Sequence, residues 1–280
     1  MPPRYEQRFF VRSYEIGAAA EVRPDIYPNY LEEGGVNASA SLGYDYDWYA
    51  RQQRVWVARK LYIRWHGVAR LGDELALTTW ISSARRVQAF REYELRRATD
   101  QTLLLRARHL WVFLDAQTLL PVRIPPEFAE RYAPTHSTAP DALEALDIDR
   151  AGLLPLDNHG APLCETDQRV AWHELDQNRH VNNAVYVRWA EQSICTALRH
   201  HGWPPEALTA DHMSRLARET DYLRSLQDNE PLTISTRIET AGVDRLLWLT
   251  TIRTPDQATP VAEDRLLCRV SSAVRQALIG

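Results

Sequence analysis

Lysine is almost absent from this sequence of 280 residues, since Lys60 is the only lysine among 33 basic residues. We attribute this bias to coding composition rather than to function. Arginine binds phosphate groups through paired hydrogen bonds, so a basic patch for a phosphate-bearing partner remains open, although the sequence does not locate one. The formal net charge of −4 and the pI near 6.2 give no reason to expect binding to nucleic acid.

Cysteines and long apolar runs are also scarce. Cys164, Cys195 and Cys268 are an odd number without paired or metal-binding spacing, so we predict no disulfide framework, and packing is the default role for the last two. The first residues contain no apolar signal core, and no run approaches the roughly 18 apolar residues that a membrane span needs. These absences favour a soluble, cytoplasmic protein with no membrane span.

The most informative stretch is residues 172–186, which lead into an amphipathic helix. Asn182 or Asn183 can cap its first turn, and Gly202 followed by Pro204 ends it, so we predict a helix over 182–201. Apolar or small residues recur on one face at helical spacing, namely Tyr186, Trp189, Ala190, Ser193, Ile194, Ala197 and Leu198.

Asp176, Asn178 and His180 precede this helix, each two residues from the next. An extended approach to the helix would put all three side chains on one side. A carboxylate, an amide and an imidazole would then meet at a helix N-terminus, whose free N–H groups suit an oxygen that becomes negative during reaction. Taken singly, an aspartate or asparagine before a helix is usually only a cap. The combination of the three groups with the asparagine pair favours a functional site.

Strand and helix patterns occur twice in the same order. The first half predicts a strand at 9–16, a helix at 26–42 and strands at 54–65, 75–81, 90–97 and 103–114. After a proline-rich polar stretch, the second half predicts a strand at 164–170, the helix at 182–201 and strands at 219–226, 232–239, 246–253 and 266–270.

Two landmarks indicate an internal duplication. Tyr30 and Tyr186 are 156 positions apart, and Leu75 and Leu232 are 157 apart. At an offset of 156 the counterparts of the three candidate site residues are Ala20, Val22 and Pro24. Only the second copy therefore retains groups capable of acid–base work.

One strand, one long helix and an antiparallel meander is the order of the hotdog fold, in which a sheet wraps a central helix. We predict an α+β protein of two tandem hotdog domains, each a long helix wrapped by an antiparallel sheet. The N-terminal domain covers 1–132, a linker covers 133–163, and a C-terminal domain with the candidate catalytic residues covers 164–280. Two copies in one chain would reproduce the dimer that single hotdog domains form, and a homodimer of the whole chain remains open.

The chain resembles the acyl-acyl carrier protein thioesterases of plants and bacteria from about residue 9 to the last strand. Landmarks of that family occur in its order: FVRSYEIG at 10–17, EGGVN at 33–37, VWVAR at 55–59, GD at 72–73, TWIS at 79–82 and IPPE at 124–127. The second half has LDQNRHVNN at 175–183, close to the family signature D-x-N-x-H-V-N-N. Single hotdog thioesterases share HVNN, so the landmarks of the first half discriminate better.

The resemblance implies hydrolysis of the thioester between a fatty acyl chain and the phosphopantetheine arm of acyl carrier protein, which releases a free fatty acid and ends chain elongation. It implies no metal or organic cofactor. The family's catalytic aspartate, asparagine and histidine carry over to Asp176, Asn178 and His180. The first domain is expected to hold the acyl chain. The small face of the 26–42 helix, which includes Gly34, fits a tunnel beside it and equally fits close packing.

The resemblance also shows a departure from the family pattern. The family's glutamate on the strand after the second helix falls at Ser225, and the cysteine that follows it in plant relatives falls at Leu226. Glu191 on the helix or Glu219 on the strand would have to supply a carboxylate instead.

Thioester hydrolysis needs an activated water and a donor to the carbonyl oxygen. Histidine titrates near neutral pH, so His180 can take the proton of water, and Asp176 can orient it or act as the base in its place. Asn178 can position the water or the carbonyl, and N–H groups at the start of the helix are the expected oxyanion donors. Two alternatives remain: an acyl-CoA thioesterase using the same residues, and a non-catalytic hotdog module that binds acyl thioesters.

Overall fold

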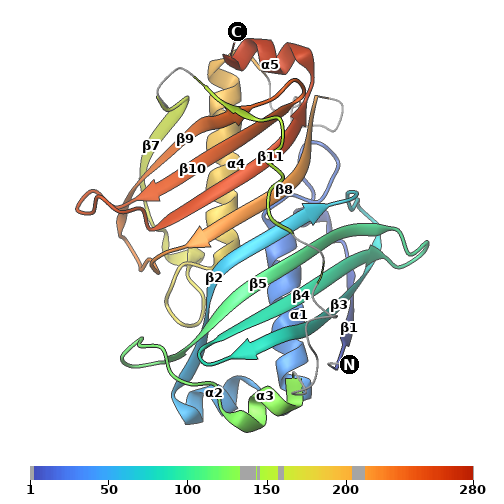
Figure 1. The fold of residues 1–280 in the computed structure, drawn as a ribbon, viewed down its shortest axis with the longest axis vertical. Coiled ribbons are helices and arrows are strands. Elements are labelled where there is room, and N and C mark those ends of the chain that lie inside the picture. The colour runs from blue at the N-terminus through green and yellow to red at the C-terminus, as the bar shows by residue number, and fades with distance from the viewer. Residues whose placement is uncertain (1–2, 133–142, 144–145, 157–160, 204–211, 280) are drawn as a thin grey trace. The chain divides into compact units, whose positions relative to one another are not determined.

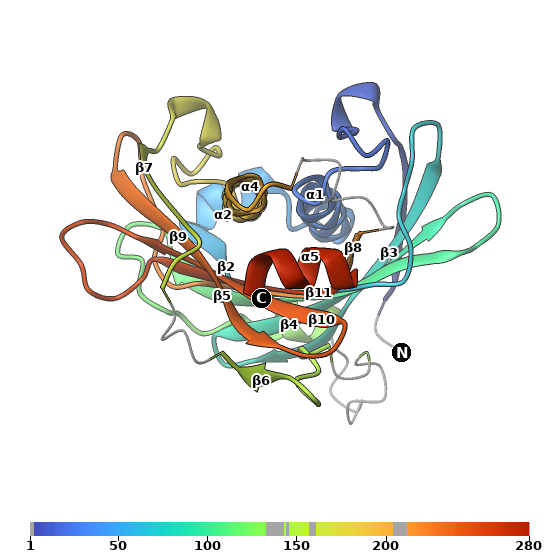
Figure 2. The same ribbon diagram turned by 90° about the horizontal axis from the view of Figure 1, so that it is seen from above.

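The computed structural model describes residues 3–132, 143, 146–156, 161–203 and 212–279. The chain forms two compact units: unit 1 is Met1–Glu15 with Tyr27–Leu146, and unit 2 is Ile16–Ile26 with Asp147–Gly280. Each unit is α+β and consists of a long helix against a curved antiparallel sheet (Figures 1 and 2). The domain boundaries drawn from the sequence, at 132 and 164, stay a prediction, because much of the stretch between them lies outside the described residues.

Unit 1 contains a five-stranded antiparallel sheet in the order β1-β3-β4-β5-β2. A short 3-10 turn at Ser13–Glu15 follows the first strand. The elements are β1 (Tyr5–Phe10), α1 (Ile26–Ser41), α2 (Tyr46–Gln52), β2 (Arg54–Trp65), β3 (Glu74–Arg85), β4 (Gln88–Arg97), β5 (Leu103–Asp115) and α3 (Pro126–Tyr132).

Unit 2 repeats this arrangement with the order β8-β11-β10-β9, and both β7 and β6 pair with β9. A 3-10 turn at Trp172–Glu174 again follows the strand before the helix. The elements are β6 (Leu154–Pro155), β7 (Cys164–Arg169), α4 (Asn183–His200), β8 (Met213–Tyr222), β9 (Pro231–Ala241), β10 (Arg245–Arg253), β11 (Ala262–Val270) and α5 (Ser272–Ile279).

Helix α4 lies in the concave face of the unit 2 sheet (Figure 2) and packs on β7, β9, β10 and β11. Its buried face includes Tyr186, Trp189, Ile194 and Leu198, as the sequence periodicity predicts. The Asn182 side chain accepts a hydrogen bond from the Ala184 N–H at 2.8 Å and begins the helix. The predicted helix at 182–201 is therefore confirmed to within one residue at each end.

Helix α1 in unit 1 approaches its sheet very closely at Gly34. A Cβ atom on this residue would lie 2.2 Å from Cδ2 of Leu77 on β3, so no larger residue fits without a shift. The small face read from the sequence reflects this close packing. Gly43, with φ of +85°, follows the helix in the left-handed conformation that glycine adopts most readily.

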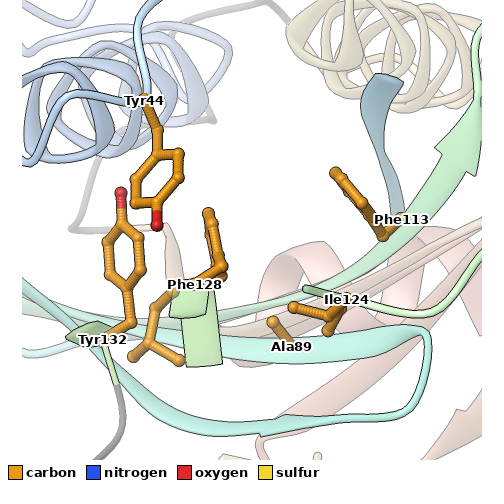
Figure 3. Close-up of a cluster of buried hydrophobic side chains, with 7 residues drawn as sticks. Tyr44, Ala89, Phe113, Ile124, Phe128 and Tyr132 are labelled. Atoms are coloured by element: carbon orange, nitrogen blue, oxygen red, sulfur yellow. The ribbon is translucent and has the colours of Figure 1, made fainter. Parts of the chain in front are cut away.

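Aromatic side chains fill one end of unit 1, where α3 docks (Figure 3). The ring of Phe128 lies 4.3 Å from that of Tyr132 and 4.7 Å from that of Tyr44, measured between centroids. Phe128 is 1% exposed, so this short helix is held mainly by burying its aromatic face rather than by helix propensity.

The repeat between the two halves of the sequence has a definite register from the first strand to the helix. The six residues of β1 and the six of β7 begin at Tyr5 and Cys164, which are 159 positions apart. The isolated bridge between Ile16 and Val22 has its counterpart, at the same offset, between Leu175 and Val181. The predicted duplication is confirmed, but the offset of 156 predicted for the strand-to-helix part is wrong.

The offset of 156 was wrong because two aromatic residues of α4 could each match Tyr30. Tyr30 of α1 bonds Glu15, and its counterpart at an offset of 159 is Trp189, which bonds Glu174 in the same way. Tyr186 lies three residues before Trp189, close to one helical turn, so both face the same side and periodicity cannot tell them apart.

The corrected offset also changes the residues that stand in for the candidate site in the first copy. Its loop carries Gly17, Ala19 and Glu21 at the positions of Asp176, Asn178 and His180, in place of the Ala20, Val22 and Pro24 predicted from the sequence. The first copy still lacks the aspartate, the asparagine and the histidine.

Candidate active site

The candidate site residues lie on a tight five-residue loop, 176–180, between the bridge partners Leu175 and Val181. The Asp176 N–H donates to the His180 carbonyl at 2.8 Å, and the Arg179 N–H donates to the Asp176 carbonyl at 3.0 Å. Arg179 has φ of +61°, which reverses the chain. The extended approach predicted from the spacing of two residues is therefore wrong, because the segment is a turn.

Asp176 holds this turn together through its own carboxylate. Its Oδ1 accepts hydrogen bonds from the N–H groups of Asn178 at 2.7 Å and His180 at 3.2 Å. Its Oδ2 accepts from the Asn178 amide nitrogen at 3.4 Å. An aspartate that bonds the backbone two residues on is a common turn-forming device, and here it competes successfully with the extended conformation. The carboxylate and the amide are thus brought together, as expected, but by a turn.

The His180 side chain is half-buried, and within the described part of the chain its imidazole makes no hydrogen bond. Asn178 is exposed. Of the N–H groups in the first turn of α4, that of Ala184 is already bonded to the Asn182 side chain, and that of Val185 to the Asn182 carbonyl. Within the described residues the N–H of Asn183 makes no hydrogen bond, so it is a candidate donor for a developing negative charge at this end of the helix.

Glu191, one of the two carboxylates considered from the sequence, is committed to an ion cluster. It lies eight residues beyond Asn183, roughly 12 Å along the helix axis at ~1.5 Å per residue. Its two oxygens pair with Arg215 and Arg218, both at 2.6 Å. Burial alone would raise the pKa of Glu191, but the two guanidinium groups hold that pKa at about 2. A carboxylate that stays ionised in this way is not suited to proton transfer.

Glu219, the other carboxylate, faces away from the helix. Arg218 and Tyr222 on the same strand, β8, bond residues of α4, whereas Glu219 accepts the Ile148 N–H at 2.6 Å. Because side chains alternate between the two faces of a strand, Glu219 lies on the opposite face of the sheet. Neither carboxylate reaches the loop.

Ser225, which the resemblance aligns with the family glutamate, does lie beside the loop. The chain leaves β8 at Tyr222, and the carbonyl of the next residue after Ser225, Leu226, accepts the Val181 N–H at 2.9 Å. The same segment carries an ion pair between Arg224 and Glu230 at 2.9 Å. Glu230 also accepts the Gln227 N–H at 2.8 Å, so its carboxylate closes this second loop.

Tyr186 connects the two loops and was read from the sequence only as a core residue. Burial raises the pKa of its hydroxyl, and the negative charges of Glu230 and Asp176 add to that rise, whereas the Leu226 backbone and the charge of Arg224 oppose it. Its hydroxyl therefore remains protonated at neutral pH. The signal that could have identified it is the aromatic residue one turn into a capped helix, directly after the asparagine pair.

Among the described residues, no group of three or more histidine, cysteine, aspartate or glutamate side chains could hold a metal ion. Within the same residues, no helix has the length and apolarity needed to cross a membrane.

Each half of the chain matches a known family of thioesterases. Residues 2–132 match the family model of the acyl-ACP thioesterase N-terminal domain, and residues 170–273 match that of the thioesterase-like superfamily. The first half of the chain thus matches the acyl-ACP thioesterase family, and the second half matches the broader thioesterase-like superfamily.

Curated members of the family are similar over most of this chain. The chloroplastic palmitoyl-acyl carrier protein thioesterase of Cuphea hookeriana is 27% identical over 244 residues, which cover 85% of this chain and 55% of the relative. The chloroplastic oleoyl-acyl carrier protein thioesterase 1 of Arabidopsis thaliana is 25% identical over 233 residues, 81% of this chain and 61% of the relative. The chain thus spans less than two thirds of the length of these relatives.

Solved structures share the fold over nearly the whole chain. A putative oleoyl thioesterase from Lactobacillus plantarum superposes with a TM-score of 0.77 at 18% identity, covering 96% of this chain and 97% of the other. The 12:0-ACP thioesterase from Umbellularia californica gives a TM-score of 0.73 at 18% identity, covering 96% and 94%. The prediction of two tandem hotdog domains is confirmed.

Proposed function

We propose that this protein hydrolyses the thioester between a fatty acyl chain and the phosphopantetheine arm of acyl carrier protein, releasing a free fatty acid. The observation that carries the proposal is the 176–180 loop, which presents Asp176, Asn178 and His180 together at the N-terminus of α4. Relatives in the same family are named as thioesterases of acyl carrier protein substrates. The partner is then acyl carrier protein, and the N-terminal domain, residues 1–132, holds the acyl chain.

Each side chain has a role that follows from its contacts. His180, whose imidazole is not engaged by the described residues, takes the proton of the attacking water. Asp176 bonds the backbone N–H of His180 and so fixes where the imidazole lies. Asn178, exposed beside it, positions the water or the carbonyl. The N–H of Asn183 faces the developing oxyanion, a contribution of about 3 kcal/mol in hydrolases where such a donor has been removed. The scheme uses no metal and no organic cofactor.

Free-acid release tests the reaction and the site together. We would assay acyl-carrier-protein and acyl-CoA substrates from C8 to C18 with wild type, His180→Ala and His173→Ala. His173 is exposed and precedes His180 by seven residues, so it is a matched control. We expect a loss of roughly a hundredfold or more in His180→Ala, within the range for removal of a general base, and wild-type rates in His173→Ala.

The outcomes separate the alternatives. Release from the acyl-CoA series that exceeds release from the carrier-protein series would replace our substrate assignment by an acyl-CoA thioesterase. Tight binding of both thioester series with no release by wild type would make the chain a binding module, an outcome that the absence of the glutamate at Ser225 favours.

A cytoplasmic location and a homodimer are the finer parts of the proposal. Cell fractionation tests the first. Sedimentation velocity at micromolar concentration tests the second, and a single species with the mass of one 32.2 kDa chain would contradict it.

A further inference from the structure

Glu174 joins three parts of unit 2 at the point where the candidate loop begins. Its Oε2 accepts the Ala171 N–H at 2.9 Å, at the end of the strand segment before the loop. Its Oε1 accepts the indole N–H of Trp189, in the second turn of α4, at 2.9 Å. Its backbone carbonyl accepts the Asn182 N–H at 3.0 Å, at the end of the loop. One residue thus fixes both ends of the loop and the helix that follows it.

Glu174 is held in place by hydrogen bonds to its buried carboxylate. Glu174 is 9% exposed, and each of its carboxylate oxygens accepts one N–H donor. Neither donor bonds any other residue that the structure describes. Hydrogen bonds to a charged acceptor are stronger than neutral ones, and a carboxylate out of water needs them to remain in place. The loop itself has exposed residues at Asn178 and Arg179, so its position relative to α4 depends on these anchors.

The first copy of the repeat contains the same device without the candidate catalytic groups. Glu15, 4% exposed, accepts the Arg12 N–H at 2.8 Å and the Tyr30 hydroxyl at 2.5 Å. Arg12, Glu15 and Tyr30 lie 159 positions before Ala171, Glu174 and Trp189. Glu15 also pairs with the Arg12 guanidinium at 3.0 Å, a contact that Ala171 cannot make for Glu174. In the second copy, Glu174 is therefore held in place by its hydrogen bonds to Ala171, Trp189 and Asn182 without help from an arginine side chain at position 171.

We propose that Glu174 is a positioning residue for the candidate active site. It sets the distance between the loop that carries Asp176 and His180 and the N-terminus of α4, which supplies the oxyanion donor. The predicted effect of Glu174 on the hydrolysis rate rests on the proposed hydrolase function. The predicted anchoring of the loop to α4 does not. Because the substrate need not touch Glu174, its loss lowers the rate of the chemical step and leaves substrate binding largely intact.

The experiment compares Glu174→Gln with Glu15→Gln in the full-length chain. Glutamine keeps the shape, but its amide oxygen can accept from only one of the two donors, and its NH₂ group then faces the other. We expect kcat to fall about 10- to 100-fold in Glu174→Gln, as for a small misplacement of reacting groups, with KM within about twofold. In Glu15→Gln we expect both constants to stay within about twofold of wild type, because Glu15 accepts the Arg12 N–H and the Tyr30 hydroxyl on one oxygen and lies beside a loop without candidate catalytic groups.

Trp189→Phe provides a second route to the same contact, since it removes the indole N–H and keeps an aromatic ring. We expect Trp189→Phe to lower kcat in the same direction, and the double variant with Glu174→Gln to lose less than the product of the two single losses. Independent effects of the two substitutions would contradict a shared anchor.

Amide hydrogen exchange tests the anchoring without any assay of activity. We expect the Asn182 and Ala171 amides to exchange at least about tenfold faster in Glu174→Gln than in wild type, with no change at those positions in Glu15→Gln. Unchanged exchange at Asn182 would overturn the inference even in an active enzyme, and so would equal losses of kcat in the two glutamate variants. A wild-type protein with no hydrolase activity, but with the expected exchange, would refute the proposed function and leave the anchor in place.

Discussion

Glu191 shows how pairing decides what a buried carboxylate can do. It lies on the same helix as the candidate site, and the sequence made it a replacement for the missing family glutamate. Arg215 and Arg218 each approach it to 2.6 Å and hold its pKa at about 2 despite its burial. The charge of Arg218, which is fully buried, pairs with Glu191 and with Asp264, the latter at 3.2 Å. The carboxylate therefore has a structural role.

Glu191→Gln is predicted to lower stability and to leave catalysis alone. The folded pKa of about 2 lies below the ordinary value of 4.5, so ionised Glu191 contributes stability that is present above pH 4.5 and is lost as pH falls toward 2. Removing the charge at pH 7 costs about 3 kcal/mol, because two guanidinium groups lose their partner. Thermal unfolding should show a lower midpoint, and kcat/KM of the folded variant should stay within about twofold of wild type. A hundredfold loss of kcat at wild-type stability would restore Glu191 as a catalytic acid or base.

At the scale of elements, strand β8 explains why the sequence located some parts of the site and missed others. The strand was predicted at 219–226 but runs over Met213–Tyr222. The part that the prediction missed contains Arg215 and Arg218, which a hydropathy pattern reads as exposed, yet both pair with Glu191, Arg218 fully buried and Arg215 partly buried. The last four residues of the predicted strand leave the sheet instead. They form the segment whose Leu226 carbonyl bonds Val181 beside the loop.

The loop and the helix of the candidate site contrast in the same way. The bounds of α4 follow from local signals, an asparagine cap and a glycine stop, and these were read correctly. The shape of loop 176–180 depends on a bond from the Asp176 side chain to backbone N–H groups, and residue spacing alone does not reveal such a bond. The three residues could be identified from the sequence, while the turn that brings them together could not.

Equivalent strands of the two units also differ in their buried polar groups. His109 on β5 is paired across the ladder with Arg91 of β4, and the matching pair in unit 2, 157 positions later, is Leu266 with Trp248. Burial, together with the positive charge of Arg91, lowers the pKa of His109 to about 3. Unit 1 therefore holds a neutral histidine where unit 2 has a leucine.

His109→Leu is predicted to make the protein less sensitive to acid. The folded pKa of about 3 lies below the ordinary 6.5, so neutral His109 disfavours folding as pH falls from 6.5 toward 3, because the unfolded chain takes up the proton. Between pH 7 and pH 5 this term amounts to at most about 2 kcal/mol. The substitution removes the ring nitrogen of His109 that hydrogen-bonds the Tyr93 hydroxyl, so the stability of the variant at pH 7 can fall. The test is therefore the slope of stability against pH. An equal drop in melting temperature from pH 7 to 5 in both proteins would contradict the assignment.

For the whole molecule, the duplication was the most far-reaching inference that the sequence supported. Family landmarks spread over both halves made the two-domain fold recognisable, since they mark turns and strand positions that hydropathy leaves ambiguous. The exact register was not recognisable, because Tyr186 and Trp189 occupy the same helical face and either could match Tyr30. The paired contacts of Glu15 and Glu174, the starts of β1 and β7, and the two isolated bridges fix the offset of 159.

The candidate site residues occur in one copy of the repeat, and Ser225 lies beside them. One copy carries Asp176, Asn178 and His180, and the family resemblance predicts that Ser225 stands in place of the family glutamate. That serine is next to Leu226, whose carbonyl is bonded to the residue after His180, so a side chain two carbons longer at this position would reach the loop. The neighbouring carboxylate of Glu230 is held by Arg224 and by the Gln227 N–H. It does not replace the missing group.

Ser225→Glu is therefore predicted to raise turnover. A carboxylate at this position would accept the proton of water or orient the imidazole of His180, and we expect kcat on the best acyl-carrier-protein substrate to rise at least about threefold, within the range of a general base added to an existing site. Ser225→Gln has nearly the same shape without the charge and should give no increase. The gain should disappear below about pH 4, where an ordinary glutamate is protonated, and should require His180, so that Ser225→Glu with His180→Ala stays inactive. Equal rates for the glutamate and glutamine variants would show that Ser225 does not occupy the position of the family glutamate.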